Sequence, residues 1–200
     1  MSDHHHAHPE PDYDEELFVA FANTLASQDG RPVERLADGE GLVRWLTAHG
    51  LLTRAPSGSA AQRAVPEFRR LRDLVRGVTE RVAATGEPTA AQVRAINRVL
   101  RDGLHFHQLR PSDDGGFTVA QVGDEIDQSR AAIAGSLAHF LADHDPRRMR
   151  ICANDGCRWR FIDRSPAGRR RWCDMSTCGN RAKVARHRAR RRAEAKPAGD

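Results

Sequence analysis

With 200 residues, of which 39% are hydrophobic and 30% are charged, the chain is long enough for one folded domain with a small appendage. Its formal net charge is +5 at pH 7, and no segment approaches the roughly 18 apolar residues that a membrane-spanning helix needs. The N-terminus is acidic and rich in histidine, unlike a secretory signal. These features exclude a membrane partner and predict a cytoplasmic, basic protein.

The predicted elements begin after a polar tail. We expect residues 1–12 to be disordered and assign them no function. Helical periodicity starts at Asp14, with apolar residues at steps of three and four as far as Leu25. Gly30 and Pro32 are expected to end this first helix.

Three more helical segments are predicted next. Residues 41–49 form a short amphipathic helix. A long apolar stripe predicts a helix over residues 61–85, with Pro66 in or near its first turn, where proline is tolerated. Thr89 is predicted to cap the helix that follows.

The period then changes from helical to alternating. Residues 104–109 and 117–122 alternate on either side of the turn sequence Pro111–Gly116, which predicts a β-hairpin. A last helix over residues 126–141 completes this part of the chain. We therefore expect a mainly α N-terminal domain, over residues 13–145, with one small β-hairpin.

Charge is divided unevenly along the chain. Residues 147–196 contain 17 Lys and Arg against 4 Asp and Glu, whereas residues 1–146 contain 15 against 22. This asymmetry favours a basic arm that binds a polyanion, attached to a body that does not. A solvated charged tail is the alternative.

All four cysteines lie in the basic segment, at Cys152, Cys157, Cys173 and Cys178. Two pairs of this kind in a cytosolic chain fit the tetrahedral thiolate site of structural zinc. An iron–sulfur cluster and a redox-switched disulfide are the alternatives. Catalytic zinc is disfavoured, because four protein thiolates leave no coordination position for water.

The residues around the cysteines predict a treble-clef-like zinc finger over residues 147–193, with a disordered tail over 194–200. Residues 158–162 and 169–172 are expected to pair as strands, and a helix is expected from about Thr177. Three aromatic side chains are expected to form a small core beside the metal: Trp159, Phe161 and Trp172.

The C-terminal helix is dense in arginine and leaves only a few small or apolar residues to pack on the zinc unit: Ala182, Val184, Ala185 and Ala189. Like charges at this density repel one another unless phosphates neutralise them. Arginine can also read guanine in the major groove of DNA. Our candidates for nucleic-acid contact are Arg169, Arg170, Arg171, Arg181, Lys183, Arg186, Arg188, Arg190, Arg191 and Arg192.

Two sets of motifs in the sequence resemble known families. The C-terminal set resembles the CGNR zinc finger: Phe161-x-Asp163-x-Ser165, Arg171-Trp172-Cys173 and Cys178-Gly179-Asn180-Arg181-Ala182-Lys183. The upstream set resembles the ABATE domain that usually precedes this finger: Phe21-Ala22-Asn23-Thr24-Leu25, Trp45-Leu46, Leu51-Leu52 and the helix–hairpin–helix run from Ile96 to Leu141.

The resemblance implies a stress-induced transcription regulator of a kind described in actinobacteria and proteobacteria, with the four cysteines as zinc ligands. It gives Asn180 and Arg181 a motif role. We expect Asn180 to brace the last cysteine turn and Arg181 to contact phosphate.

No catalytic motif is found in the sequence: no phosphate loop, dinucleotide fingerprint, GxSxG or HExxH. We therefore expect a nucleoid-associated regulator that binds duplex DNA. Its N-terminal domain would sense a small-molecule effector, form a homodimer or bind another protein. One alternative is an RNA- or ribosome-associated zinc protein. The other is an enzyme with a structural zinc, which would need a polar pocket in residues 13–145.

Overall fold

The structure is a computed structural model and describes residues 16–28, 31–104 and 106–194. The tail predicted over residues 1–12 lies outside the described residues, as does most of the tail predicted over 194–200. The helices are α1 (Leu17–Ala22), α2 (Gly39–Ala48), α3 (Gly58–Thr85), α4 (Ala90–Asp102), α5 (Glu125–Asp143) and α6 (Asn180–Glu194). The strands are β1 (Leu25–Gln28), β2 (Arg31–Glu34), β3 (Phe106–Pro111), β4 (Phe117–Val122), β5 (Met149–Ile151) and β6 (Arg160–Ile162).

The strands pair as three antiparallel hairpins, β1–β2, β3–β4 and β5–β6. The mainly α fold with small hairpins and a C-terminal cysteine unit that leads into a helix confirms the predicted fold class. Among the described residues, no helix combines the length and apolar character that crossing a bilayer requires.

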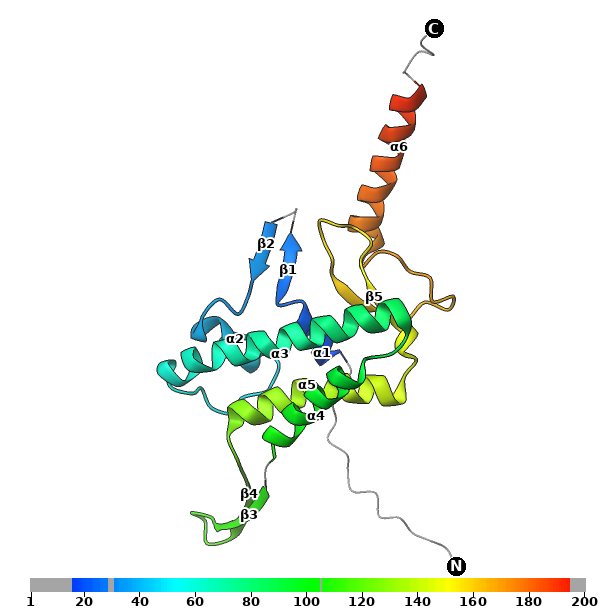
Figure 1. The fold of residues 1–200 in the computed structure, drawn as a ribbon. Coiled ribbons are helices and arrows are strands. Elements are labelled where there is room, and N and C mark those ends of the chain that lie inside the picture. Colours follow the sequence, from blue (N-terminus) through cyan, green and yellow to red (C-terminus); the bar gives the residue numbers. More distant parts are fainter. Residues whose placement is uncertain (1–15, 29–30, 105, 195–200) are drawn as a thin grey trace, which may run out of the picture.

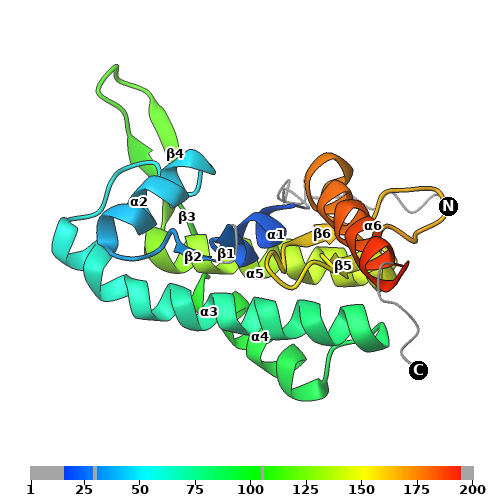
Figure 2. The same cartoon turned by 90° about the horizontal axis from the view of Figure 1, so that it is seen from above.

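The long helix α3 is the spine of the molecule (Figure 1). Seen from above, α2 lies toward one end of α3 and the β5–β6 hairpin toward the other (Figure 2). Aromatic rings fill the core between these elements. Phe21 lies 5.2 Å from Trp45 and 6.2 Å from Phe68, and Phe18 lies 5.2 Å from Phe140, all measured between ring centroids. Burial of these rings against α3 and α5 stabilises the helical body.

Local capping signals set the helix boundaries that the sequence predicted best. The carboxylate of Asp38 accepts a hydrogen bond from the Gly41 amide (2.8 Å) and begins α2. Thr89 and Gln92 form a reciprocal capping box at the start of α4, which confirms the predicted cap.

The first predicted helix was wrong beyond Ala22. The chain leaves α1 at Asn23, and the Oγ1 of Thr24 donates to the carbonyl of Phe21 (2.7 Å). Leu25 then begins β1 rather than continuing the helix. The side chain of Asn23 is held by a distant strand, so tertiary contacts override the helical spacing of the apolar residues.

The predicted position of Pro66 was also wrong. Ser57 caps α3, which therefore begins at Gly58 and places Pro66 more than two turns inside the helix. A proline there removes one backbone hydrogen bond. Pro66 lies on the exposed face of α3, so water can reach the carbonyl of Gln62 that loses its partner.

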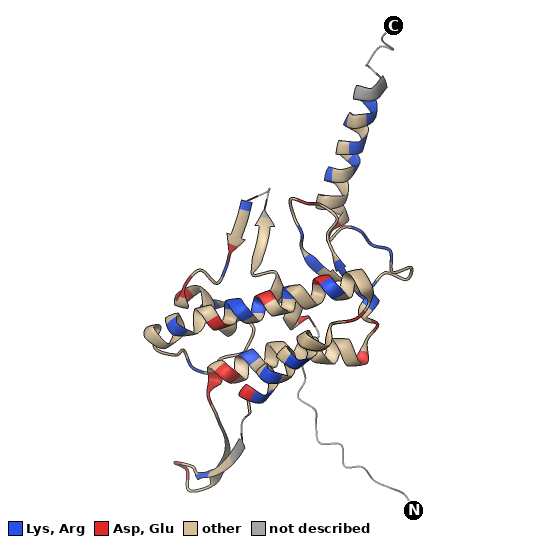
Figure 3. Ribbon diagram, in the orientation of Figure 1, with Lys and Arg blue, Asp and Glu red and all other residues tan. Residues whose placement is uncertain are grey.

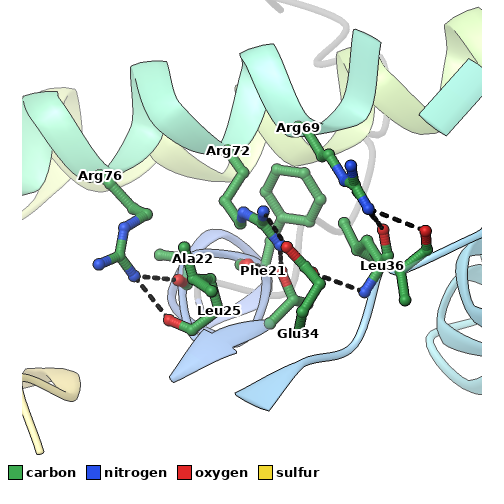
Figure 4. A network of polar contacts seen from close by, with 10 residues as sticks. Phe21, Ala22, Leu25, Glu34, Leu36, Arg69, Arg72 and Arg76 are labelled. Carbon is green, nitrogen blue, oxygen red and sulfur yellow. Dashed lines mark hydrogen bonds and ion pairs between the residues drawn. The ribbon is translucent and has the colours of Figure 1, made fainter. Parts of the chain in front are cut away.

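Three arginines on one face of α3 hold the β1–β2 hairpin and the segment that follows it (Figure 4). Arg76 donates to the carbonyls of Ala22 (3.0 Å) and Leu25 (2.7 Å). Arg72 donates to both carboxylate oxygens of Glu34 (2.6 Å each). Arg69 donates to the carbonyls of Leu36 (2.9 Å) and Ala37 (2.8 Å). The hairpin contributes little apolar surface of its own, so these polar contacts fix its position.

Glu34→Gln is expected to lower the free energy of unfolding by about 2 kcal/mol at pH 7, because Arg72 is buried and would lose a charged partner. Burial raises the pKa of Glu34, but the hydrogen bonds from Arg72 and the Leu36 amide, together with the charges of Arg72 and Arg69, outweigh it and hold the pKa below its usual range. The stabilisation is therefore present above the unfolded pKa of about 4.3 and is lost as the pH falls through the folded pKa. Urea unfolding of both proteins between pH 7 and pH 3 measures the difference; one that stays constant with pH would contradict this assignment.

Candidate metal centre and nucleic-acid interface

The four cysteines converge on one point. Their Sγ atoms all lie within 4.8 Å of one another. The Sγ of Cys173 lies 3.7 Å from that of Cys157 and 3.8 Å from that of Cys178. Zinc–sulfur bonds of 2.3 Å in a tetrahedron require sulfur–sulfur edges of about 3.8 Å. The donor set and its spacing fit zinc, and the four cysteines form a structural zinc site.

The β5–β6 hairpin presents the first two cysteines. Cys152 follows β5, and its amide donates to the carbonyl of Trp159 (2.8 Å). The carbonyl of Asn154 accepts from the amides of Cys157 (2.8 Å) and Arg158 (3.0 Å), which closes the turn. Arg158 takes a positive φ of 54° to make this turn. The site is thus preformed by backbone hydrogen bonds.

A π-turn over Met175–Gly179 presents the last cysteine and leads directly into α6. The carboxylate of Asp174 accepts from the amide of Thr177 (2.8 Å) and so caps the turn. A Cβ atom at Gly179 would lie 3.0 Å from the sulfur of Met175, whose side chain is exposed and would have to move slightly to make room. The side-chain amide of Asn180 donates to the carbonyl of Ser176 (2.9 Å), a contact that braces the turn.

A side chain outside the four ligands, that of Asn154, contacts a ligand sulfur. The side-chain amide of Asn154 donates to the Sγ of Cys178 (3.4 Å). Burial by itself would raise the pKa of Cys178, but hydrogen bonds from Asn154 and the neighbouring thiols bring it below its ordinary value. Burial raises the pKa of Cys157 and of Cys173. A bound metal ion holds all four as thiolates.

Asn154→Ala is expected to weaken zinc binding by about 10- to 100-fold, as removal of partners of metal ligands generally does. The change removes the hydrogen bond to Cys178 and also the one that the Oδ1 of Asn154 accepts from the amide of Gly156 (3.1 Å), whereas the carbonyl of residue 154 still closes the turn. Competition with a chromophoric chelator measures the dissociation constant. Asp155→Ala, at the neighbouring exposed position, is the matched control, and equal affinities for the two variants would refute a role for the Asn154 amide.

The small core beside the metal is as the sequence predicted. Phe161 is buried together with Cys152 and Cys178, and Trp159 and Trp172 pack against them. The predicted pairing of residues 158–162 with 169–172 was wrong, because β6 pairs with β5 instead.

The carboxylate of Asp163 explains why residues 169–172 do not form a strand. It is buried and accepts hydrogen bonds from the amide and hydroxyl of Ser165 (3.0 and 2.6 Å) and from the amide of Arg170 (2.7 Å). The amide of Arg170 is therefore taken by a side chain rather than by a neighbouring strand. Burial raises the pKa of Asp163, but these hydrogen bonds lower it below its usual value.

The zinc unit is built into the helical body rather than tethered to it. Met149 of β5 is fully buried in the main core. The backbone of Arg160 makes two hydrogen bonds of 2.9 Å with the side-chain amide of Asn23. The guanidinium of Arg160, which is 1% exposed, donates to the hydroxyl of Thr79 (3.0 Å) and the carboxylate of Glu80 (2.6 Å) of α3. Burial is the main cause that lowers the pKa of Arg160 to about 10.

Sequence reasoning missed this junction. A buried arginine looks like any other arginine of the basic segment, and Asn23 was noted only as part of a motif. The isolated polar pair Asn23-Thr24 inside an apolar helical pattern was the one available signal.

Helix α6 leads away from the body, with Lys and Arg along its length (Figures 1 and 3). The described basic side chains of α6 are all exposed: Arg181, Lys183, Arg186, Arg188, Arg190 and Arg191. Arg192 lies in α6, but its side chain is outside the described residues. Of the four residues expected to pack on the zinc unit, only Ala182 is half-buried, and Val184 is 48% exposed. The helix therefore presents nearly its whole circumference to solvent.

The three arginines before the last cysteine pair differ from one another. Arg169 is exposed. The guanidinium of Arg170 donates to the carbonyls of Trp172 (2.8 Å) and Cys173 and lies 5.1 Å from the centre of the Phe161 ring. That of Arg171 lies 5.4 Å from the ring of Trp172. Arg170 thus stabilises the loop that leads to the zinc ligands.

Comparison with known families agrees with this architecture. Residues 15–144 match the ABATE family, described as "Putative stress-induced transcription regulator", and residues 148–191 match the CGNR zinc finger. No curated protein matches the chain. The ABATE match covers more than half of the sequence, and the finger match contains all four cysteines. The chain therefore belongs to the ABATE family and carries a CGNR zinc finger.

Proposed function

We propose that the protein binds duplex DNA through α6 and acts as a zinc-dependent transcription regulator. The observation that carries the proposal is the exposed, arginine-rich helix α6 rising directly from the zinc site. Fifteen helical residues are about 22 Å long, and the major groove of B-DNA, about 12 Å wide, admits a helix of this kind. Phosphates on both sides of the groove would neutralise the arginines around the helix.

The placement of the aromatic side chains favours duplex DNA over single-stranded RNA. Proteins that bind unpaired bases display aromatic rings on which the bases stack. Phe161 is buried in the small core beside the metal, with Trp159 and Trp172 packed against it. The described part of the finger thus offers a charged helix and no row of open rings.

The family description, a stress-induced transcription regulator, supports a regulatory role in a stress response. Binding of duplex DNA would place the protein on the nucleoid. We assign residues 13–145 to sensing of a small-molecule effector or to dimerisation, and residues 147–193 to DNA contact. The matched families are described as a regulator and a zinc finger rather than as enzymes. Four thiolate ligands also leave the metal without an open position for a substrate.

Selection of genomic DNA fragments by the zinc-loaded protein tests the proposal. The wild type is expected to enrich one short sequence motif, and Cys178→Ser is expected to lose that enrichment. Binding of structured or single-stranded RNA in preference to every duplex would contradict duplex recognition. Equal retention of all fragments by both proteins would show that the arginines bind polyanions without selection.

A further inference from the structure

The β3–β4 hairpin exposes an apolar face at the end of the molecule opposite α6 (Figure 1). Leu109 lies opposite Val119 in the hairpin register, and Pro111 lies opposite Phe117. Because side chains alternate between the two faces of a strand, these four share one face. Leu109 is 64%, Phe117 71% and Val119 66% exposed. We call these four residues the hairpin face.

The hairpin lacks the support that such a face normally has. A two-stranded hairpin is marginally stable in water unless another layer covers its apolar side. In the described structure β3 pairs only with β4, so each strand also has one unpaired edge. Three of the seven large apolar side chains that the described residues expose lie on this single face, rather than scattered over the surface.

We propose that the hairpin face packs against the same face of a second copy of the chain, related by a two-fold axis. The proposal goes beyond DNA binding and does not depend on it. An isologous contact of this kind would place Leu109 and Val119 of the two copies together in a small sandwich of two hairpins.

The charge distribution fits a second copy at this end of the molecule and not a polyanion. Arg110 on the hairpin is offset by Asp113 and Asp114 at its turn, so the region is nearly neutral and attracts no polyanion. The opposite end of the molecule carries the exposed arginines of α6, where two copies would repel each other (Figure 3). Contact through the hairpin faces leaves both α6 helices free.

The area of the face sets the expected strength. One aromatic side chain offers about 150–250 Å², so four largely exposed apolar side chains make a patch on the order of 400 Å² per copy. Standard interfaces bury about 800 Å² per partner. Half of that area predicts a reversible dimer with a dissociation constant in the micromolar range, rather than an obligate one.

Sedimentation equilibrium of the zinc-loaded full chain, without nucleic acid, tests the proposal over about 1–300 μM protein. The wild type is expected to show a monomer–dimer equilibrium. Val119→Lys places a charge in the centre of the face and is expected to raise the dissociation constant at least tenfold. Thr118→Lys adds the same charge to the next residue of β4, on the opposite face, and is expected to leave the constant unchanged.

A monomeric wild type over the whole range would overturn the proposal, and so would equal weakening by the two lysine variants. Val119 is exposed in the monomer, so both variants should melt at the wild-type temperature in dilute solution. Phe117→Ser provides a second disruption of the face if Val119→Lys fails that check. Because no DNA is present, failure of this proposal leaves the proposed function standing, and the reverse also holds.

Discussion

Cys178→Ser is expected to weaken zinc binding by well over 100-fold, which exceeds the 10- to 100-fold effect of losing an outer partner of a ligand. A serine hydroxyl stays protonated at neutral pH and is a poor ligand for zinc. Cys178 is 5% exposed and also forms part of the small buried core, so the change removes a metal bond and leaves a polar group among Phe161 and the tryptophans.

The consequence for α6 follows from its position. Cys178 lies in the π-turn that leads directly into the helix, and α6 has almost no packing contact of its own. A helix of this length without tertiary support is marginal in water. Loss of the metal bond should therefore release the base of α6 and abolish site-selective DNA binding together with zinc binding.

Chelator competition and quantitative DNA binding measure the two effects in parallel. Met175→Ala is the matched control, because it removes a 62% exposed side chain from the same turn and no ligand. Retention of zinc by Cys178→Ser within tenfold of the wild type would contradict a four-thiolate site. Loss of zinc with unchanged DNA selectivity would show that α6 does not need the metal to select its DNA site.

Simultaneous replacement of Arg186, Arg188 and Arg190 by glutamine is expected to lower DNA affinity by two orders of magnitude or more. Each phosphate contact contributes about 0.9 to the slope of log K against log salt concentration, so the slope should fall by about 3 if all three contact phosphate. Glutamine and arginine have similar helix propensities, so α6 should remain helical.

The fold offers a matched control for charge. Arg94, Arg98 and Arg101 are also exposed on one helix, α4, which belongs to the helical body. Their replacement by glutamine removes the same three charges and is expected to change affinity and slope little. Binding titrations at four salt concentrations compare the two triple variants. Equal losses would mean that overall charge, and not α6, determines binding.

The sequence predicted the elements that are specified by residues close to them in the chain. Caps mark the start of α4, alternation marks the β3–β4 hairpin, and the spacing of the cysteines marks the zinc site. Each of these signals lies within a few residues of the structure that it specifies, which makes it readable without knowledge of the fold.

The features that it did not predict depend on partners far along the chain. The β1–β2 hairpin is held by arginines of α3 some forty to fifty residues away, and the path of residues 163–170 by the buried carboxylate of Asp163. Arg160 counted as one basic residue among many, yet it joins the finger to α3. The contacts of the α6 arginines with DNA stay a prediction.

Because Met149 and Arg160 are buried in the helical body, the chain cannot be cut between the body and the finger without disrupting both. A fragment that ends before Met149 would leave an empty site in the core of the body. A fragment that begins there would expose that methionine and strip Arg160 of Thr79 and Glu80, even with zinc in place. The finger is therefore not an independent unit that could be exchanged between proteins. Grafting the finger onto another scaffold would transfer the metal site but not the orientation of α6 relative to the body, because the contacts of Arg160 with α3 set that orientation.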